Sequence, residues 1–332
     1  MQSKINVKNL SSHFKKGIAA ILIMLFTAAL FTACGEKKDD KTVRISVNKI
    51  TEAGSRPNTD REGYAIILPE KINRIITIGP SNTEILAGLG FAANIIAADM
   101  YSSDVAGLSP NTQTVLDMMS LDAEYIINLM PDVIFITGMS RGGSEDNPLA
   151  AVSRTGITII FIPTSISIAE IMEDIRFIAA VMDVKETGEN IISYMQAEID
   201  RIKKTAQTIT EKRKVYFEIS PAPWMYSFGA DTFLNEMIEL TGAVNIFSGQ
   251  TGWLSVSDEA LLSANPDVIL TSTYFLDDPA AEITGRPGFG VITAVQNGNV
   301  FYIDSASSSR PSQNLILALN EISNAVYPEY YR

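Results

Sequence analysis

The pattern that decides the fold occurs twice in this chain, at residues 122–134 (DAEYIINLMPDVI) and at residues 257–269 (SDEALLSANPDVI). Each copy places a glutamate ahead of a helical turn of aliphatic residues and then reads Pro-Asp-Val-Ile, at an offset of 135 residues. Proline ends the helix, aspartate occupies the turn, and Val-Ile begins a buried strand. One copy in each half of the chain predicts two similar lobes, since a solenoid needs short periods and several copies.

Strand-like and helix-like segments alternate on both sides of the repeat. The expected strands are residues 65–69, 74–78, 95–98, 133–136, 158–162 and 215–219, with a weakly alternating edge strand at 42–48. The expected helices of the first half begin at Ser81, Asp122 and Leu149. Short apolar strands between helical segments predict an α/β fold with two Rossmann-like lobes, whose mostly parallel sheets are covered on both faces.

The helix that begins at Ser81 carries the sequence of a capping box, because Glu84 follows Ser81 by three residues. In that motif each side chain accepts a hydrogen bond from a free N–H of the first helical turn. The sequence therefore predicts that Glu84 is a helix cap and not a ligand contact.

A long helical region with few breakers lies between the two lobes. Ile191, Met195, Ile199 and Ile202 share one helical face, and basic residues follow near its end, as the helix dipole favours. We expect one long helix at 183–210 to join the lobes. The predicted organisation is a signal peptide at 1–34, a tether and irregular segment at 35–62, an N-terminal lobe at 63–182, this linker helix, and a C-terminal lobe at 213–332.

The N-terminus has the organisation of a secretory signal peptide that ends at Cys34, the sole cysteine. Four lysines without an acidic residue precede a short apolar run at 17–26, and small residues follow it. The ending at 31–34 (FTAC) resembles a bacterial lipobox, in which the cysteine is lipidated, although Phe31 stands where an aliphatic residue is usual. A buried free cysteine and a permanent membrane span are the alternatives. We expect a protein that works outside the cytoplasm, tethered by lipid at Cys34.

The composition of the part after residue 34 excludes several classes of function. It holds 22 basic and 38 acidic residues, a net charge of −16, which argues against nucleic acid or anionic lipid as a partner. The only histidine, His13, precedes Cys34, so the common catalytic triads, zinc sites and thiol nucleophiles are excluded. A carboxylate-dependent extracytoplasmic hydrolase and a sensor or adhesive lipoprotein remain as alternatives to a binding protein.

Five short motifs in order resemble the cluster A-III substrate-binding lipoproteins of bacterial ABC importers. They are residues 74–86 (RIITIGPSNTEIL), 228–237 (FGADTFLNEM) with 242–247 (GAVNIF), 252–259 (GWLSVSDE), 287–289 (PGF) and 294–304 (AVQNGNVFYID). That family carries iron–siderophore complexes, haem or cobalamin. The resemblance implies two lobes joined by a rigid helix with a ligand cleft between them, and no enzymatic activity.

The resemblance also implies partners. In that family one surface glutamate on each lobe pairs with an arginine of the permease, and the repeat places these residues at Glu124 and Glu259. The alternative is that both are solvated first-turn residues near a helix N-terminus. The expected partners are an ABC permease dimer with its ATPase, a small-molecule metal chelate and the membrane through the lipid. The expected protein is a monomer without a resident cofactor or metal, on the periplasmic side or at the cell surface.

Six residues in loops after expected strands are the candidate ligand contacts: Tyr101, Trp253, Arg310, Arg141, Trp224 and Tyr226. Open α/β sheets bind ligands at such positions, although large aromatic residues often belong to a core and a loop arginine is often only solvated. The ligands that we expect are a ferric siderophore and then cobalamin. Free zinc or manganese is disfavoured and haem on an axial histidine is excluded, whereas haem ligation by Tyr or Met stays open.

Overall fold

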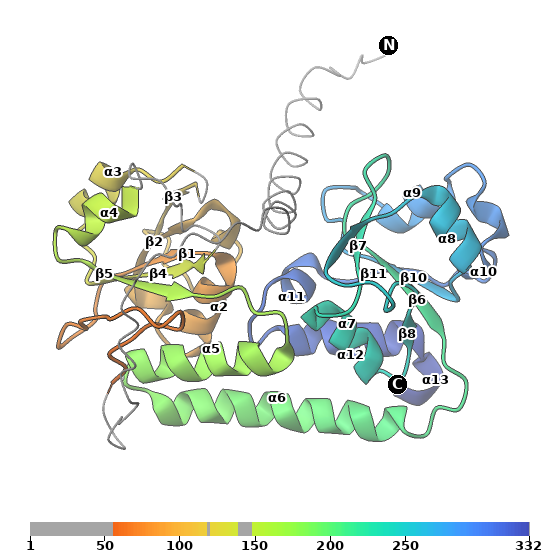
Figure 1. Ribbon diagram of the computed structural model, residues 1–332, viewed down its shortest axis with the longest axis horizontal. Helices are drawn as coiled ribbons and strands as arrows, with labels where there is room; N and C mark the ends of the chain where they lie inside the picture. Colours follow the sequence, from red (N-terminus) through yellow and green to blue (C-terminus); the bar gives the residue numbers. More distant parts are fainter. Residues whose placement is uncertain (1–55, 118–119, 139–147, 332) are drawn as a thin grey trace, which may run out of the picture. The chain divides into compact units, whose positions relative to one another are not determined.

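The computed structural model describes residues 56–117, 120–138 and 148–331 (Figure 1). The lipobox at Cys34, the expected edge strand at 42–48 and the candidate Arg141 lie outside these residues. No helix within the described ranges is long and apolar enough to cross a membrane.

The first lobe is built on a five-stranded parallel sheet with the strand order β3-β2-β1-β4-β5. Its strands are β1 (Ile75–Ile78), β2 (Ile95–Asp99), β3 (Gln113–Leu116), β4 (Val133–Thr137) and β5 (Thr158–Ile162). Its helices are α2 (Pro80–Gly88), α3 (Ala123–Asn128), α4 (Pro148–Ser153) and α5 (Ile168–Val181), with short 3-10 turns η1 (Ala92–Asn94) and η2 (Met100–Ser102). One face packs on α2 and α5 and the other on α3 and α4, which confirms the predicted covered parallel sheet.

The second lobe repeats this plan with a four-stranded parallel sheet of order β11-β10-β6-β8. The strands are β6 (Lys214–Glu218), β8 (Val244–Asn245), β10 (Val268–Thr271) and β11 (Val300–Tyr302); β7 (Tyr226–Phe228) and β9 (Trp253–Ser255) form a separate antiparallel pair. The helices are α7 (Phe233–Leu240), α8 (Asp258–Ala264), α9 (Pro279–Thr284), α10 (Thr293–Gln296), α11 (Ser305–Ser309), α12 (Leu315–Val326) and α13 (Pro328–Tyr331), with the 3-10 turn η4 (Phe289–Val291).

In each lobe, the Pro-Asp-Val-Ile repeat connects the same two neighbouring strands of the sheet. The Asp132 carboxylate accepts hydrogen bonds from the N–H groups of Asn73 and Arg74, just before β1. The Asp267 carboxylate accepts the equivalent bond from the N–H of Lys214, the first residue of β6. The aspartate of each copy therefore attaches the start of its own strand to the start of the neighbouring central strand.

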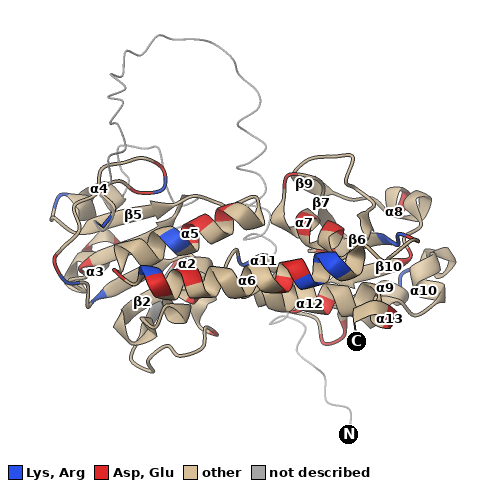
Figure 2. Ribbon diagram, turned by 90° about the horizontal axis from the view of Figure 1, so that it is seen from below, with Lys and Arg blue, Asp and Glu red and all other residues tan. Residues whose placement is uncertain are grey.

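The linker is α6 (Lys185–Ala206), which lies against α5 and contacts α7, α12 and α13 (Figure 1). Its buried stripe contains Met195, Ile199 and Ile202 as expected, but Ile192 is buried where the sequence indicated Ile191, which is half-buried. Gly188 permits the close approach to α5, because a Cβ at this position would stand 2.5 Å from the Cβ of Ala179. Figure 2 shows acidic and basic residues interspersed along α5 and α6. Arg176 of α5 and Glu189 of α6 form an exposed ion pair.

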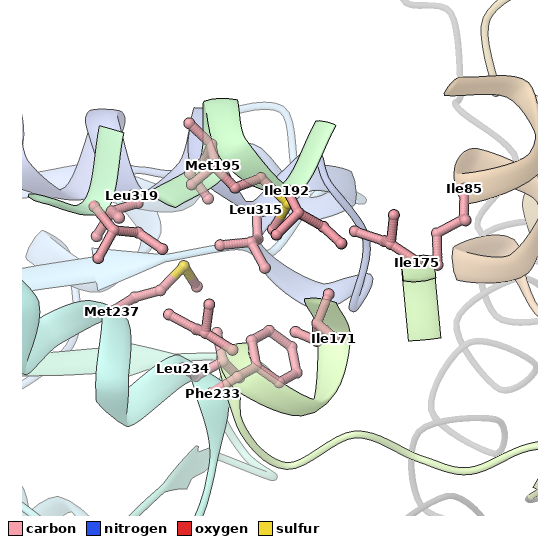
Figure 3. Packing of buried hydrophobic residues seen from close by; sticks show 14 of the residues in the cluster. Ile85, Ile171, Ile175, Ile192, Met195, Phe233, Leu234, Met237, Leu315 and Leu319 are labelled. Atoms are coloured by element: carbon pink, nitrogen blue, oxygen red, sulfur yellow. The ribbon is translucent and has the colours of Figure 1, made fainter. Parts of the chain in front are cut away.

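A continuous hydrophobic cluster runs from the first lobe through the linker into the second lobe (Figure 3). It includes Ile85 of α2, Ile175 of α5, Met195 of α6, Met237 of α7 and Leu319 of α12. Because protein interiors are close-packed and resist deformation, the two lobes share one rigid base.

Two local expectations are wrong. Residues 65–69 form no strand, since Ala65 makes only an isolated bridge to Thr59 and Ile67 is 88% exposed. The capping box is also absent: α2 begins at Pro80 after Gly79, which supplies no side-chain cap. Proline is favoured at the first helical position, so the helix starts one residue before Ser81 and Glu84 is free for another role.

Candidate ligand-binding site

The carboxyl ends of both sheets carry the sequence-predicted aromatic residues that the structure describes. Tyr101 lies in η2 directly after β2, and Trp224 lies in the loop after β6. Tyr226 and Trp253 begin β7 and β9, whose pairing places Trp253 opposite Phe228. Trp253 therefore lies in a strand, where the sequence suggested a loop. Tyr101, Trp224 and Trp253 are exposed and Tyr226 is half-buried.

A buried carboxylate holds Tyr101 in place. Asp99, at the end of β2, is fully buried and accepts hydrogen bonds from the N–H of Tyr101 (2.8 Å), the N–H of Gly79 (2.9 Å) and the hydroxyl of Ser102 (2.7 Å). Asp99 thus ties the turn after β1 to the turn after β2. The backbone of Tyr101 is fixed while its ring remains 36% exposed.

The electrostatic surroundings of Tyr101 include the second-lobe residue Tyr274. Burial, followed by the nearby Tyr274, Asp117 and Asp99, raises the pKa of Tyr101 above its ordinary value. Tyr274 belongs to the loop after β10, and its ring makes an edge contact with Phe275 at 5.7 Å between centroids. Sequence reasoning missed this pair; the available signal was an aromatic dipeptide directly after the buried strand β10.

The second-lobe candidates form a separate group. The Trp253 ring meets the buried Phe228 ring edge-on at 6.4 Å, so one part of the indole is packed while 44% of the residue stays exposed. Within the described ranges no hydrogen bond or ring contact joins Trp224 or Trp253 to Tyr101. The structure therefore joins Tyr101 to Arg310 through the Tyr101 carbonyl, and places Tyr226 and Trp253 in the β7–β9 pair, opposite Ser255 and Phe228 respectively.

Arg310 does not present an open guanidinium. Its Nη1 donates to Glu84 Oε1 (2.9 Å), and its Nη2 donates to Asp104 Oδ1 (2.8 Å) and to the Tyr101 carbonyl (2.9 Å). All three acceptors belong to the first lobe, whereas Arg310 follows α11 in the second. Arg310 therefore contacts the candidate site by holding the Tyr101 backbone. The carboxylates of Glu84 and Asp104 offset its charge.

Glu84 is the centre of this inter-lobe contact, and its predicted role as a helix cap is wrong. Besides Arg310, its carboxylate accepts hydrogen bonds from the Asn314 amide (2.9 Å) and the Ser312 hydroxyl. Its main-chain carbonyl accepts one from Gln313 Nε2 (2.8 Å). The side chain is 4% exposed, since it points from α2 into the second lobe.

A second buried ion pair lies under the Trp224 loop. Arg286 forms a bidentate pair with Glu218 at the end of β6, with both distances 2.7 Å, and also donates to the Met225 sulfur (3.1 Å). Burial raises the pKa of Glu218 in spite of Arg286. The pair fixes the loop that carries Trp224, and nothing in the sequence linked these two residues.

Glu124 and Glu259 occupy equivalent positions. Each lies in the first turn of a short helix, α3 or α8, whose N-cap side chain (Asp122 or Ser257) accepts a hydrogen bond from the backbone. Both glutamates are exposed, and neither has an ion-pair partner among the described residues. Hydrogen bonds from its own N–H and from Ser257 lower the pKa of Glu259.

The described ranges contain no cluster of three or more His, Cys, Asp or Glu side chains able to hold a metal ion. A groove of about 740 Å³ lies between α5, α6 and α7 and includes Met172, Lys203 and Glu239. None of the candidate ligand contacts lines it.

Comparison with known proteins agrees with this arrangement. A model described as periplasmic binding protein matches residues 75–307. An uncharacterized ABC transporter substrate-binding lipoprotein, YvrC of Bacillus subtilis, is 27% identical over 96% of this chain and 99% of its own length. A vitamin B12-binding protein of Photorhabdus laumondii is 26% identical over 60% of this chain and 70% of its own. The crystal structure of a possible iron-binding periplasmic solute-binding protein from Staphylococcus epidermidis matches with a TM-score of 0.67 and 26% identity, covering 78% of this chain and 100% of that one.

Proposed function

We propose that this chain, which belongs to the periplasmic binding protein family, is the substrate-binding component of an ABC importer and captures a ferric siderophore or a cobalamin. The observation that supports the proposal is that exposed aromatic residues follow strands of both sheets at their carboxyl ends, Tyr101 after β2 and Tyr274 after β10. Large, partly flat ligands need such surfaces, because aromatic faces supply contact area while a few polar groups fix orientation.

The similarity to a vitamin B12-binding protein and to a possible iron-binding protein supports this class of ligand. Trp224 and Trp253 are further exposed aromatic residues of the second lobe. Asp99 and Arg310 hold the backbone of Tyr101, and Arg286, which pairs with Glu218, contacts Met225 beside Trp224. A site of this kind is preorganised, which reduces the ordering cost of binding.

The delivery step in this proposal uses Glu124 and Glu259. Both carboxylates are exposed on equivalent helices and have no partner among the described residues to neutralise them. Arginine is well suited to receive them, because its guanidinium forms bidentate hydrogen bonds with a carboxylate. Lipid attached to Cys34 would keep the protein beside its permease outside the cytoplasm; loss of labelled fatty acid in Cys34→Ala tests the anchor.

Tryptophan emission tests ligand capture directly, because Trp224 and Trp253 are the two tryptophans of the chain. An iron chelate or corrinoid absorbs broadly and should quench them in a saturable way. Mass spectrometry of the molecule that co-purifies from native cells identifies the ligand. Tight one-to-one binding of free Fe³⁺ or Zn²⁺ without a chelator would contradict the proposed ligand class.

A further inference from the structure

We infer that the site selects a chelate or corrinoid without net negative charge, and that Tyr274 with Phe275 forms the second-lobe face of the site opposite Tyr101. This inference rests on the proposed function and specifies the ligand that the same site accepts.

Tyr274 and Phe275 are exposed aromatic residues in the loop at the carboxyl end of β10. Tyr274 is 64% exposed and Phe275 39% exposed, although both follow a completely buried strand. Their mutual edge contact keeps the two rings together. Tyr274 follows β10 at the carboxyl end of the second sheet, as Tyr101 follows β2 at the carboxyl end of the first, and Tyr274 is one of the groups that raise the pKa of Tyr101. Adjacent exposed aromatic rings of this size on a folded protein mark a binding surface.

The charged side chains in the loops that follow the strands of both sheets are predominantly acidic. The described loops that directly follow the strands of both sheets contain six acidic residues, all aspartates: Asp104, Asp117, Asp122, Asp277, Asp278 and Asp304. The described part of these loops contains no basic residue, and Arg310 lies just beyond α11, which follows the last of them. Several charges of one sign on a cleft raise the local concentration of the opposite charge and repel the same charge.

Arg310 cannot offset this field for an anionic ligand. Its guanidinium is 14% exposed and is already paired with Glu84 and Asp104. Arg61, which approaches the loop after β5, is likewise paired, with the buried Asp174 at 2.7 Å. A trianionic catecholate complex or a haem with two carboxylates would therefore meet acidic groups without an open cation among the described loop residues. A neutral corrinoid or a cationic hydroxamate complex meets no such repulsion.

The test uses four probes on the full-length protein purified from cells, with tryptophan quenching as the readout. Cyanocobalamin is neutral, ferrioxamine B is a monocation, ferric enterobactin is a trianion and haemin carries two carboxylates. We expect cyanocobalamin or ferrioxamine B to bind at least about a hundredfold more tightly than ferric enterobactin or haemin, and binding of the cation to weaken as salt is added.

Two variants separate the aromatic and charge components. Tyr274→Ala should weaken the bound probe by about two- to tenfold, the loss of one aromatic contact, whereas Tyr194→Ala, an equally exposed tyrosine on α6 (60%), should not. Asp277→Asn should weaken ferrioxamine B severalfold and leave cyanocobalamin unchanged, with the exposed Asp183→Asn at the α5–α6 turn as its control.

Each outcome decides a different point. Ferric enterobactin or haemin binding as tightly as the neutral and cationic probes would overturn the charge inference and leave the proposed function standing. An unchanged affinity in Tyr274→Ala would remove Tyr274 from the site. Failure of all four probes to bind would contradict the proposed function itself.

Discussion

At the scale of single residues, two buried carboxylates organise the site without touching its open surface. Glu84 accepts hydrogen bonds from Arg310, Ser312, Gln313 and Asn314 of the other lobe. Glu218 forms a bidentate ion pair with Arg286, which also contacts Met225 in the loop that carries Trp224. Removing one partner of a buried ion pair leaves a charge without compensation and typically costs about 3–5 kcal/mol. These residues should therefore affect stability first and ligand affinity second.

Arg310→Ala should destabilise the protein, because it leaves the buried Glu84 carboxylate without its cation. We expect a loss of about 3 kcal/mol in the free energy of unfolding, measured by urea denaturation. Arg176→Ala, which breaks an exposed pair on α5, should cost less than about 1 kcal/mol. Equal losses in the two variants would show that the inter-lobe contact is not a stabilising one.

The pH dependence of stability reports on Glu218. Burial raises its pKa in the folded protein, so the unfolded chain loses this proton first as the pH rises. The stability that Glu218 contributes is then complete below the ordinary glutamate value of about 4.3 and declines as the pH rises through the raised folded-state value. Glutamine resembles the protonated form and does not titrate, so the stability of Glu218→Gln should fall less than that of the wild type as the pH rises over that window.

Thermal unfolding across about pH 4 to 7 measures this difference in Tm. Glu329→Gln, which alters an exposed pair with Arg213, provides the control. If Glu218→Gln instead lost stability relative to the wild type as the pH rises, the attraction of Arg286 would outweigh the burial of Glu218.

At the scale of elements, the repeat builds one helix–turn–strand unit in each lobe. α3 and α8 end in left-handed residues, Met130 (φ 47°) and Asn265 (φ 46°), and the following Pro-Asp leads into β4 or β10. The aspartate fixes the strand start, and the helix presents its first-turn glutamate outward. The same local chemistry therefore produces two equivalent exposed carboxylates.

Replacing both Glu124 and Glu259 by Ala should abolish uptake and leave ligand affinity unchanged, because both residues are exposed on helices outside the loops that carry the aromatic candidates. Transport of labelled ligand into cells and quenching of the purified variant measure the two properties separately. Glu186→Ala, an exposed glutamate also in a first helical turn, serves as the control for uptake and affinity. Normal uptake, or a loss of affinity, in the double variant would refute docking through these residues.

At the scale of the whole described chain, the continuous hydrophobic cluster and the Glu84–Arg310 contact both oppose movement of the lobes. Bending α6 would separate Met195 from the cluster residues of α7 and α12 (Figure 3). The loss of close packing carries a cost that ligand binding must supply.

Solution X-ray scattering should therefore show little change in the radius of gyration when ligand saturates the site. Arg310→Ala, which removes the polar contact between the lobes, should permit a larger change than the wild type. A large ligand-induced contraction of the wild-type protein would contradict a rigid base.

The sequence alone determined the features that depend on local patterns: two parallel α/β lobes, the linker helix and the equivalence of Glu124 and Glu259. Apolar runs and breaker residues are local signals, so the buried strands and the position of Tyr101 after β2 could be read directly, whereas Trp253 lies in β9 and not in the expected loop. Residues 65–69 do not form the expected strand, because a strand also needs a neighbouring strand to pair with. The tertiary structure provides only an isolated bridge between Ala65 and Thr59.

Only the tertiary structure decided what the charged and aromatic side chains of the site do. Glu84 and Arg310 are 226 residues apart, and the capping pattern around Ser81 gave no sign that Glu84 points into the other lobe. Tyr274 becomes a candidate ligand contact through its electrostatic interaction with Tyr101, a residue of the other lobe. Contacts between distant segments depend on how the two sheets pack relative to each other. The periodicity of the sequence carries no information about that packing.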